Sequence, residues 1–390
     1  MTRNRWLFVV IPIALVAAGV VAWLQRGTAG GTSASGSATN SAAGGACELT
    51  EVPNTAADKD IWNGTARVRQ GILVAGTQYT GSISNAISGE GTSKGWTVRP
   101  IKVWGQTSSS LEDVSSDGAG GAWAVGVLIR SPAISRWNGA TWTVAPVADP
   151  GPGLDALSGV AALTPRLAWA VGRHEVGDAY RTLIERWDGS TWERVGSPNV
   201  GTGPNALKDV AVTAPDDAWA VGWHVAGRSY RPLVEHWNGT RWSVVPTPDL
   251  GSGDAILTGL VARGTRDVWA VGSVTQADVP SPVVERWNGS RWARFPVPSD
   301  LGPAAITDVT TTTGGVVLVG RRIIDQVPQP LAIVLDRTGW HEAPLTAAPS
   351  SQASLSSVTT DASGVMWAVG TRLGSTGSFG SLVVSGCAPA

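Results

Sequence analysis

The sequence predicts an all-β protein, a seven-bladed β-propeller of four-stranded antiparallel blades, preceded by one transmembrane helix and a flexible linker. Two repeated patterns predict the blades: a WAVG-type tetrapeptide that recurs about every 50 residues, and a hairpin signal followed by a second tryptophan. Composition is the third observation, because 49 Gly and 24 Pro in 390 residues favour short strands and turns over helices.

The tetrapeptide repeat defines the units. Between 46 and 50 residues separate successive copies, and seven copies fit the chain. WAVG begins at Trp123, Trp169, Trp219, Trp269 and Trp367, with weaker forms at Leu73 and Val317. A repeat of this length without helical periodicity is typical of one propeller blade per unit.

The second landmark predicts the last hairpin of each unit. A tryptophan follows the tetrapeptide by 23 residues at Trp96, Trp192, Trp242, Trp292 and Trp340, and by 19 residues at Trp142. Asn-Gly or Asp-Gly precedes it in four units, at 138–139, 188–189, 238–239 and 288–289. These dipeptides readily adopt the positive φ of tight hairpins. Most tryptophans are therefore predicted to pack between blades.

The fourth unit shows the expected strand order. Its strands are predicted at 207–212, 218–223, 232–237 and 241–245, with a turn at Pro215-Asp216-Asp217. Such an antiparallel meander leaves the longer connections on one face. That face carries the loops between units and the loops between second and third strands, and loops on a rigid scaffold are the expected recognition surface.

The seventh unit lacks a fourth strand, and the N-terminus is predicted to supply it. The chain ends soon after Leu382–Ser385, the third strand, whereas Cys47–Pro53 resembles the fourth strand of other units. Cys47 and Cys387 then take the positions of the two hairpin tryptophans. Paired residues on adjacent antiparallel strands can form a disulfide, so a Cys47–Cys387 bridge is predicted, with two free buried thiols as the alternative.

The N-terminal sequence predicts that the propeller lies outside the cytoplasm. Trp6–Leu24 is an uncharged apolar run after Arg3 and Arg5, so 1–26 is predicted as a cytoplasmic stub and signal anchor. A cleaved signal peptide is the competing interpretation. Residues 27–46, almost entirely Gly, Ala, Ser and Thr, are predicted as a disordered tether for a 47–390 propeller. The predicted location is a single-pass cell-membrane protein, or a secreted one after cleavage.

The repeats resemble known bacterial propeller repeats. The pattern W-[ND]-G-x-x-W resembles the Asp-box turn of BNR-type propellers, although its spacing is one residue shorter and Trp187 replaces the Thr or Ser before Asp188. The WAVG strands are similar to those of bacterial WAVG-type propellers and, more distantly, of photosystem II assembly-factor propellers. The resemblance covers residues 47–387. It implies the fold, and no activity, because such turns occur in enzymes and in binding proteins.

The candidate ligand site lies in the second-to-third strand connections of units three and four. Arginine, aromatic and histidine side chains there suit a carboxylate, a phosphate or a sugar. The candidates are Arg173, His174, Tyr180, Arg181, Trp223, His224, Arg228, Tyr230 and Arg231. Duplication of similar units is the alternative explanation. No metal site is predicted, since no third ligand recurs beside the two histidines.

Two recurring sets of carboxylates are interpreted as structural. Cross-strand or interblade pairing, suggested by the following Arg186, His236 and Arg286, is predicted for one set, and a solvated place along the central channel for the other. The first set is Glu185, Glu235 and Glu285, and the second is Asp113, Asp209 and Asp308.

The predicted function is binding without catalysis. The charges nearly cancel, 29 Lys and Arg against 30 Asp and Glu, which excludes a nucleic-acid footprint. A membrane-tethered, monomeric propeller without cofactor is predicted to bind a protein or a cell-envelope glycan through its long-loop face. The alternative is a glycan-acting hydrolase or lyase of sialidase-like type, which needs a close pair of carboxylates. Scattered candidates are Glu175, Asp178, Asp249 and Asp254.

Overall fold

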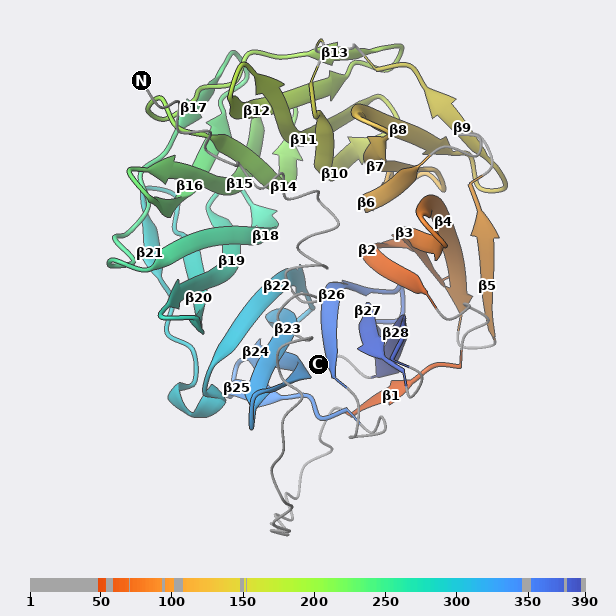
Figure 1. The fold of residues 1–390 in the computed structure, drawn as a ribbon, viewed down its shortest axis with the longest axis vertical. Helices are drawn as coiled ribbons and strands as arrows, with labels where there is room; N and C mark the ends of the chain where they lie inside the picture. The colour runs from red at the N-terminus through yellow and green to blue at the C-terminus, as the bar shows by residue number, and fades with distance from the viewer. Residues whose placement is uncertain are drawn as a thin grey trace, which may run out of the picture.

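A computed structural model describes residues 48–53, 59–69, 71–92, 95–101, 108–147, 151, 153–345, 352–374 and 377–386. Across these ranges the strands form seven antiparallel sheets of four strands, which stand as blades around a common centre (Figure 1). The first strand of each blade lies nearest the centre and the fourth at the outer edge. The predicted seven-bladed propeller is confirmed.

The first four blades follow the chain order. Blade 1 contains β2 (Asp60–Val68), β3 (Gly71–Thr80), β4 (Ile83–Thr92) and β5 (Gly95–Pro100). Blade 2 contains β6 (Ser109–Ser116), β7 (Ala122–Leu128), β8 (Ser131–Trp137) and β9 (Trp142–Ala145). Blade 3 contains β10 (Ala156–Thr164), β11 (Leu167–Val176), β12 (Ala179–Trp187) and β13 (Trp192–Arg194). Blade 4 contains β14 (Asn205–Ala214), β15 (Asp217–Ala226), β16 (Ser229–Trp237) and β17 (Trp242–Val244).

The remaining blades complete the ring. Blade 5 contains β18 (Asp254–Gly264), β19 (Asp267–Gln276), β20 (Val279–Trp287) and β21 (Trp292–Arg294). Blade 6 follows a short 3-10 helix, η2 (Ser299–Leu301), and contains β22 (Ala304–Thr311), β23 (Val316–Ile324), β24 (Val327–Asp336) and β25 (Gly339–Glu342). Blade 7 contains β26 (Ala353–Thr360), β27 (Met366–Leu373), β28 (Phe379–Gly386) and β1 (Leu49–Glu51).

The tryptophans pack between blades, as the repeats predict. The fully buried Trp169 of blade 3 lies against both hairpin tryptophans of blade 4, with ring centroids 5.0 Å from Trp237 and 5.1 Å from Trp242. Trp123 and Trp219 make the same two contacts with blades 3 and 5. Each such aromatic contact contributes roughly 0.5–1.5 kcal/mol of stability beyond the contribution of the apolar area it buries. These tryptophans are therefore part of the core rather than a binding platform.

The hairpin signals form the tight turns that were predicted. The Asn138 side chain accepts hydrogen bonds from the amides of Ala140 and Thr141, at 2.9 and 2.8 Å, while Gly139 has a φ of 96°. Asp188, Asn238 and Asn288 bond the following amides in the same way. A side chain that bonds its own turn requires no ligand to explain it.

The second and third strands are longer than predicted. In blade 4, β15 continues three residues past Trp223, and β16 begins three residues before Pro232. Their continuous pairing runs from Ala218↔Trp237 to Ala226↔Ser229. The predicted long loops of units three and four are consequently hairpins with two-residue turns, at 177–178 and 227–228.

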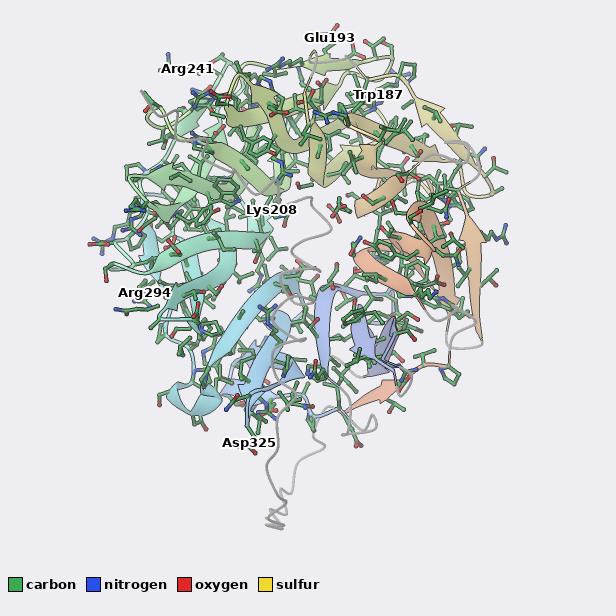
Figure 2. All side chains as sticks on the ribbon, in the orientation of Figure 1. Trp187, Glu193, Lys208, Arg241, Arg294 and Asp325 are labelled. Carbon is green, nitrogen blue, oxygen red and sulfur yellow. The ribbon has the colours of Figure 1, made fainter. Side chains whose placement is uncertain are left out.

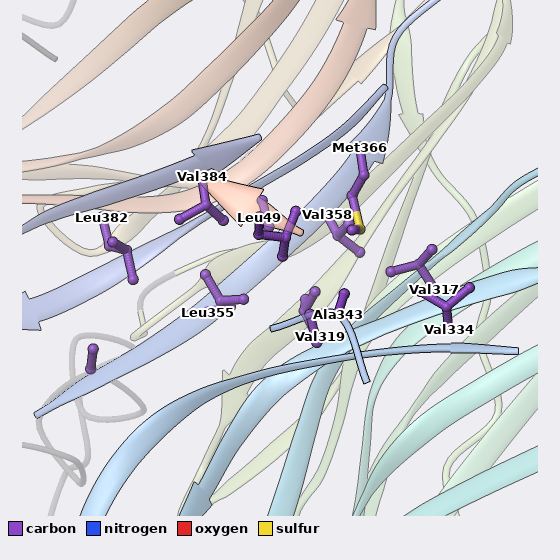
Figure 3. Packing of buried hydrophobic residues seen from close by; sticks show 13 residues of the cluster. Leu49, Val317, Val319, Val334, Ala343, Leu355, Val358, Met366, Leu382 and Val384 are labelled. Atoms are coloured by element: carbon purple, nitrogen blue, oxygen red, sulfur yellow. The ribbon is translucent and has the colours of Figure 1, made fainter. Parts of the chain in front are cut away.

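The N-terminal strand closes the last blade, as predicted. β1 pairs with β28 through Leu49↔Gly386, and the Leu49 amide also donates to the Pro344 carbonyl at 2.8 Å. Leu49 is fully buried beside Met366 and Val384, where the first and last strands meet (Figure 3). One segment thus joins blade 7 to blade 6 and completes the ring.

The predicted equivalence between the cysteines and the hairpin tryptophans is wrong. Gly370 pairs with Leu382 where Gly272 pairs with Val283, so the third strand of blade 7 is shifted by one residue from the expected alignment. Gly386 therefore stands at the position of Trp287. Its partner Leu49, rather than Cys47, takes the place of the second tryptophan.

Cys47 and Cys387 themselves lie outside the described residues. The disulfide between them stays a prediction. Intact mass of the oxidised chain after denaturation and alkylation should show no alkylated thiol, and reduction should expose two. A bridge around a loop of 340 residues should stabilise the fold by roughly 5 kcal/mol in the loop-entropy model. Two alkylated cysteines before reduction would exclude it.

The predicted signal anchor at 1–26 and tether at 27–46 also lie outside the described residues. Within the ranges that the structure covers, no helix is long and apolar enough to cross a membrane.

Candidate functional site

One face of the ring carries the turns between the second and third strands, and we call it the hairpin face. The candidate residues of blades 3 and 4 lie on its hairpins. Only Arg228 lies in a turn, whereas the other eight lie in strands β11, β12, β15 and β16. Cross-strand pairing places His174 opposite Arg181 and His224 opposite Arg231. The two blades therefore present matching sets of side chains.

Arg181 and Arg231 serve as links between blades. The Arg181 guanidinium donates to the carbonyls of Gly203, at 2.8 Å, and Thr202, at 3.2 Å, in the segment that leads into blade 4. Arg231 donates to the Gly253 carbonyl at 2.7 Å, just before blade 5. These bonds favour the duplication interpretation, because each arginine satisfies backbone carbonyls at the equivalent junction with the next blade.

The two histidines are suited to structural roles. His174 is only 8% exposed, and its Nε2 lies 2.5 Å from an Nη of Arg194. Burial, with the charges of Arg194 and Arg181, lowers the pKa of His174 to about 4. Burial and Arg231 also lower the pKa of His224. A neutral imidazole accepts from Arg194, and no group of three metal-ligating side chains occurs among the described residues.

Trp223 and Tyr230 form the aromatic part of the candidate site. Their rings meet edge to face with centroids 4.9 Å apart, and both are partly exposed. The Tyr230 amide donates to an Asp254 carboxylate oxygen at 2.9 Å. The sequence thus identified a real aromatic pair, held at the blade 4–5 junction.

Three of the four carboxylates considered for hydrolysis are engaged with the backbone, and the fourth, Asp178, is exposed in the turn at 177–178. Glu175 accepts from the Leu154 amide at 2.7 Å, and Asp249 accepts from the Gly251 amide at 2.9 Å. Asp254 holds Tyr230, as described above. Glycoside hydrolysis needs two carboxyl groups that face a common substrate space. These three instead stabilise turns and junctions.

The predicted cross-strand or interblade pairing of the recurring glutamates is found in part. Glu185 and Glu285 lie opposite Arg194 and Arg294 of the fourth strands. Glu235 accepts from Ser197, in the segment between blades 3 and 4.

The basic residues that follow the glutamates have other partners. Arg286 donates to Asp267 at 2.7 Å, and His236 lies 2.6 Å from Asp217, so both basic side chains pair with aspartates. Arg186 stacks over the Trp169 ring at 5.5 Å. The glutamates themselves are fully buried, and burial raises the pKa of Glu185 and Glu285 to about 7 and of Glu235 to about 8. Uncharged carboxyls fit this environment.

All seven blades, as far as the structure describes them, share a register shift near the start of their first strand, and blades 3, 4 and 5 have a second one near its end. The extra residues of the shared shift are Asn63, Glu112, Ser158, Lys208, Thr258, Thr307 and Ser356. A β-bulge redirects a side chain, and here the first strands lie nearest the ring centre. Lys208 accordingly lies at the central opening, whereas Glu193, Arg241 and Arg294 lie at the outer edge (Figure 2).

Most neutral bulge residues bond the neighbouring blade. Asn63 donates to the Leu111 carbonyl at 2.6 Å, and Thr307 donates to the Leu355 carbonyl at 2.8 Å. Thr258 donates to the Ile306 carbonyl at 3.0 Å. Glu112 and Lys208 occupy the same position in blades 2 and 4 with opposite charges. Glu112 and Lys208 are therefore the charged exceptions among the bulge residues.

The recurring aspartates also link blades. A carboxylate oxygen of Asp113 accepts from the Val160 amide at 2.8 Å, and one of Asp209 accepts from Leu260 at 2.7 Å. Asp308 accepts from Val358 at 2.8 Å. Burial is the largest influence on all three carboxyls and raises their pKa, for Asp113 to about 8. They act as interblade acceptors, and all three residues are partly exposed on the first strands.

Several charged and phenolic side chains near the bulges act on one another electrostatically, and we call them the central cluster. It consists of Tyr79, Glu112, Arg173, Tyr180, Lys208 and Tyr230, from blades 1 to 4. These include all three tyrosines of the chain. Glu112 acts electrostatically on Tyr79, Arg173 and Lys208, and Arg173 lies 4.5 Å above the Tyr180 ring. Among these residues, the sequence had singled out only Arg173, Tyr180 and Tyr230.

Burial dominates the titration of the cluster. It raises the pKa of Glu112, and it lowers the pKa of Lys208 and of Arg173. A Ser110 hydroxyl donates to Glu112 at 2.8 Å. Aligning the seven units by their bulge residues would have revealed Glu112 and Lys208, but that register is visible only in the pairing.

The hairpin tips expose aliphatic side chains. Five residues at equivalent tips form what we call the hairpin-tip ring: Ile83, Ile129, Val176, Val279 and Ile324, exposed by 41, 62, 50, 50 and 45%. They belong to blades 1, 2, 3, 5 and 6. Among the described residues only Val144 and Val244, on fourth strands, are comparably exposed large aliphatic residues. Ile129 has a φ of 62°, a strained value for a β-branched residue.

The chain is similar to propellers of known structure. YCF48 from Cyanidioschyzon merolae matches at 14% identity with a TM-score of 0.55, over 88% of this chain and 99% of that one. YCF48 bound to D1 peptide matches at 14% identity with a TM-score of 0.54, over 88% and 95%. U3-55K matches at 11% identity with a TM-score of 0.54, over 86% and 98%. Similarity at this identity shows the propeller fold alone.

No protein-family model matches the chain, and no curated protein matches it. The resemblance of its repeats to WAVG-type and BNR-type propellers is thus supported at the level of the fold. The class that the fold defines is the seven-bladed β-propeller.

Proposed function

We propose that this chain is a non-catalytic binding propeller that holds a protein partner on its hairpin face. The hairpin-tip ring carries the proposal. Five aliphatic side chains occupy equivalent tips of five blades, although each is exposed by 41% or more. Isolated exposed aliphatic residues are common, but a set that gathers at the hairpin tips of one face is typical of an interaction surface.

The backbone strain at Ile129 also favours the hairpin face as the binding surface. A β-branched residue at a φ of 62° costs roughly 1–3 kcal/mol, and the side chain is also 62% exposed. Glycine occupies the corresponding first turn position in blades 3 and 4, at Gly177 and Gly227. Conformational strain without burial in the free protein fits a residue that is buried on binding.

A groove on the hairpin face could receive part of the partner. It lies between blades 6 and 7, has a volume of about 490 Å³, and continues from Ile324 of the hairpin-tip ring. Val327, Pro330 and Leu345 provide apolar walls, and the Arg322–Glu342 and Arg372–Glu51 ion pairs provide polar ones. Interface pockets of this mixed character commonly hold the anchoring side chain of a partner.

A protein partner fits these features better than a glycan. Sugar sites depend on exposed aromatic platforms, whereas most tryptophans here pack between blades. Trp223 and Tyr230 form the aromatic pair on the hairpin face, and their edge-to-face contact covers part of each ring. A structure of YCF48 bound to D1 peptide shows that another propeller of this fold holds a peptide.

We further propose that the propeller acts outside the cytoplasm. The apolar segment within 1–26 would anchor it in the cell membrane, and 27–46 would act as a flexible tether with a reach on the order of 25 Å. A single propeller domain on such a tether can present its hairpin face to an envelope protein.

Site-specific photocrosslinking tests the proposed function. A photoreactive benzoylphenylalanine at Ile129 or Val279, in the full chain expressed in its native cell, should yield discrete protein adducts. The same group at Thr240 or Ser290, exposed in turns on the opposite face, is the matched control and should not. Adducts from both faces alike, or from neither, would contradict the proposal. Adducts that disappear after glycosidase digestion would support a glycan partner instead.

A further inference from the structure

A cleft on the face opposite the hairpin face plays no part in the proposed function. It has a volume of about 620 Å³. Its walls come from β4 and the end of β2 in blade 1, from the turns at 117–121 and 138–141 in blade 2, and from the turn at 165–166 in blade 3. Sites for small molecules typically have volumes of roughly 300–1,000 Å³. The cleft therefore has the size of a small-molecule site.

The cleft is open because the first turn of blade 2 carries few side chains. Blades 3, 4 and 5 join their first two strands by two residues, whereas blade 2 uses the five residues 117–121, of sequence DGAGG. The Asp117 side chain is buried and accepts from the amides of Ala119 and Gly121, both at 2.9 Å. A Cβ at Gly121 would come within 2.5 Å of an Asp117 carboxylate oxygen and 2.6 Å of an Arg136 nitrogen. Only glycine leaves this space free.

Four charged side chains line the cleft, and two of them neutralise each other. Arg136 donates to Asp117, and its guanidinium lies 4.6 Å from the centroid of the Trp123 ring. This ion pair is fixed by the protein itself. The charge that a ligand meets therefore depends on the other two side chains, Arg69 and Glu90.

Arg69 and Glu90 are an unpaired cation and an unpaired anion. Arg69 is exposed just after β2 and reaches the blade 2 turn, where its Nε would lie 3.5 Å from a Cβ at Gly120. Glu90 is partly buried in β4. Among the described residues, no opposite charge lies within 4.0 Å of either side chain, so they do not pair with each other. The cleft thus offers one positive and one negative group to a ligand.

The Trp137 indole adds a neutral donor. Its N–H makes no hydrogen bond with the described residues, and its nitrogen is not sealed from solvent. The equivalent Trp187 and Trp237 donate to the carbonyls of Pro165 and Pro215 in their own blades, at 3.0 and 3.2 Å. Trp137 makes no such bond, so its N–H can donate to a ligand.

We propose that this cleft binds a small zwitterion that carries an amine and a carboxylate, as a free amino acid or a short peptide does. Arg69 pairs with the carboxylate, Glu90 pairs with the ammonium group, and Trp137 donates to a carbonyl. A simple anion would meet Glu90 and Asp117, and a simple cation would meet Arg69 and Arg136. A neutral ligand would cover both unpaired charges without replacing their water, which is costly. A zwitterion satisfies both charges at once.

Trialanine and its two blocked forms test the site, by ligand-observed NMR on the full chain in a non-ionic detergent. Trialanine carries both charges, N-acetyltrialanine lacks the amine, and trialanine amide lacks the carboxylate. Trialanine should bind about tenfold more tightly than either blocked form, because each block removes one charge-assisted hydrogen bond.

Substitutions should act on the matching end of the probe. Arg69→Gln should weaken trialanine about tenfold and change trialanine amide by less than about twofold, since the amide has no carboxylate to lose. Glu90→Gln should weaken trialanine about as much and leave N-acetyltrialanine within about twofold. Arg166→Gln is the matched control, an exposed cation in the equivalent turn of blade 3 that does not line the cleft, and it should change trialanine binding by less than about twofold.

Three outcomes would overturn the proposal. Equal binding of trialanine and both blocked forms would show that the two charges take no part. Tighter binding of the neutral disaccharide cellobiose than of trialanine would make the cleft a saccharide site. Absence of trialanine binding would exclude the site. The photocrosslinks from Ile129 report on the other face, so this cleft can fail while the hairpin face stands, and the reverse.

Discussion

Replacing Glu235 by glutamine should increase the free energy of unfolding at pH 8 by roughly 3–4 kcal/mol. The side chain is fully buried in β16, and burial raises the pKa of Glu235 from 4.5 to about 8. Among the residues that the structure describes, only the Ser197 hydroxyl donates to it, at 2.9 Å. Ionisation at alkaline pH leaves a buried charge with one polar partner. Glutamine keeps the shape and the acceptor and removes the charge.

The pH dependence of this effect has a definite sign. The folded state holds the Glu235 proton more tightly than the unfolded state, so the stabilisation is fully present below about pH 4.5 and is lost as the pH rises through about 8. Denaturant unfolding at pH 5 and pH 8 measures it. The gain from Glu235→Gln should be small at pH 5 and large at pH 8.

Glu193→Gln provides the control for surface charge, because Glu193 is exposed on the outer strand β13 (Figure 2). It should change stability by less than about 0.5 kcal/mol at either pH. Glu185→Gln and Glu285→Gln should behave like Glu235→Gln with smaller gains, since burial raises their pKa only to about 7. Equal effects of Glu235→Gln at pH 5 and pH 8 would contradict a buried, uncharged carboxyl group.

The blades were predictable because their signals are local. A dipeptide such as Asn138-Gly139 encodes its own turn, and a WAVG run such as Trp169–Gly172 encodes a buried middle strand. The repeat then fixes blade number without knowledge of long-range contacts. Closure by the N-terminal strand was predictable for the same reason, since one unit lacked a strand and one segment was unassigned.

The register in which the strands pair was harder to predict than the presence of the strands. Val383-Val384 resembles Val283-Val284 in sequence, yet it aligns one residue away, because a run of aliphatic residues looks the same after a shift. The pairing of Gly370 with Leu382 decides the register, and that contact depends on how the whole blade packs. The proposed equivalence of Cys47 and Cys387 with tryptophans failed at this step.

The candidate site was predicted in part. Arg173 contacts the Tyr180 ring and is influenced electrostatically by Tyr230, whereas Arg181 and Arg231 bond the neighbouring backbone. Glu112 and Lys208 were missed because a β-bulge turns each toward the ring centre, and no local sequence signal marks the bulge. Exposure of the aliphatic tips depends likewise on hairpins whose length exceeds the predicted strands.

Leu49→Asp should destabilise the propeller by about 4 kcal/mol or more, the largest loss expected for a single substitution here. Leu49 has no exposed surface, and its side chain packs with Val384, Met366 and Ala343, so it joins β1 and β28 to blade 6 (Figure 3). Aspartate would lose this apolar contact and bury a carboxylate without a designed partner. Because β1 is the strand that closes the ring, blades 6 and 7 should separate before the rest unfolds.

Thr50→Asp is the matched control, since Thr50 is the next residue of β1 and its side chain is exposed. It should change stability by less than about 0.5 kcal/mol. Both variants should be unfolded with denaturant under reducing conditions, so that a Cys47–Cys387 bridge cannot hold the strand in place. Limited proteolysis should cut Leu49→Asp near blades 6 and 7 and leave Thr50→Asp intact. Equal stability of the two variants would mean that the ring does not depend on β1, and closure would then have to come from contacts between blades 7 and 1, such as the bond from the Thr65 amide to the Ser357 hydroxyl.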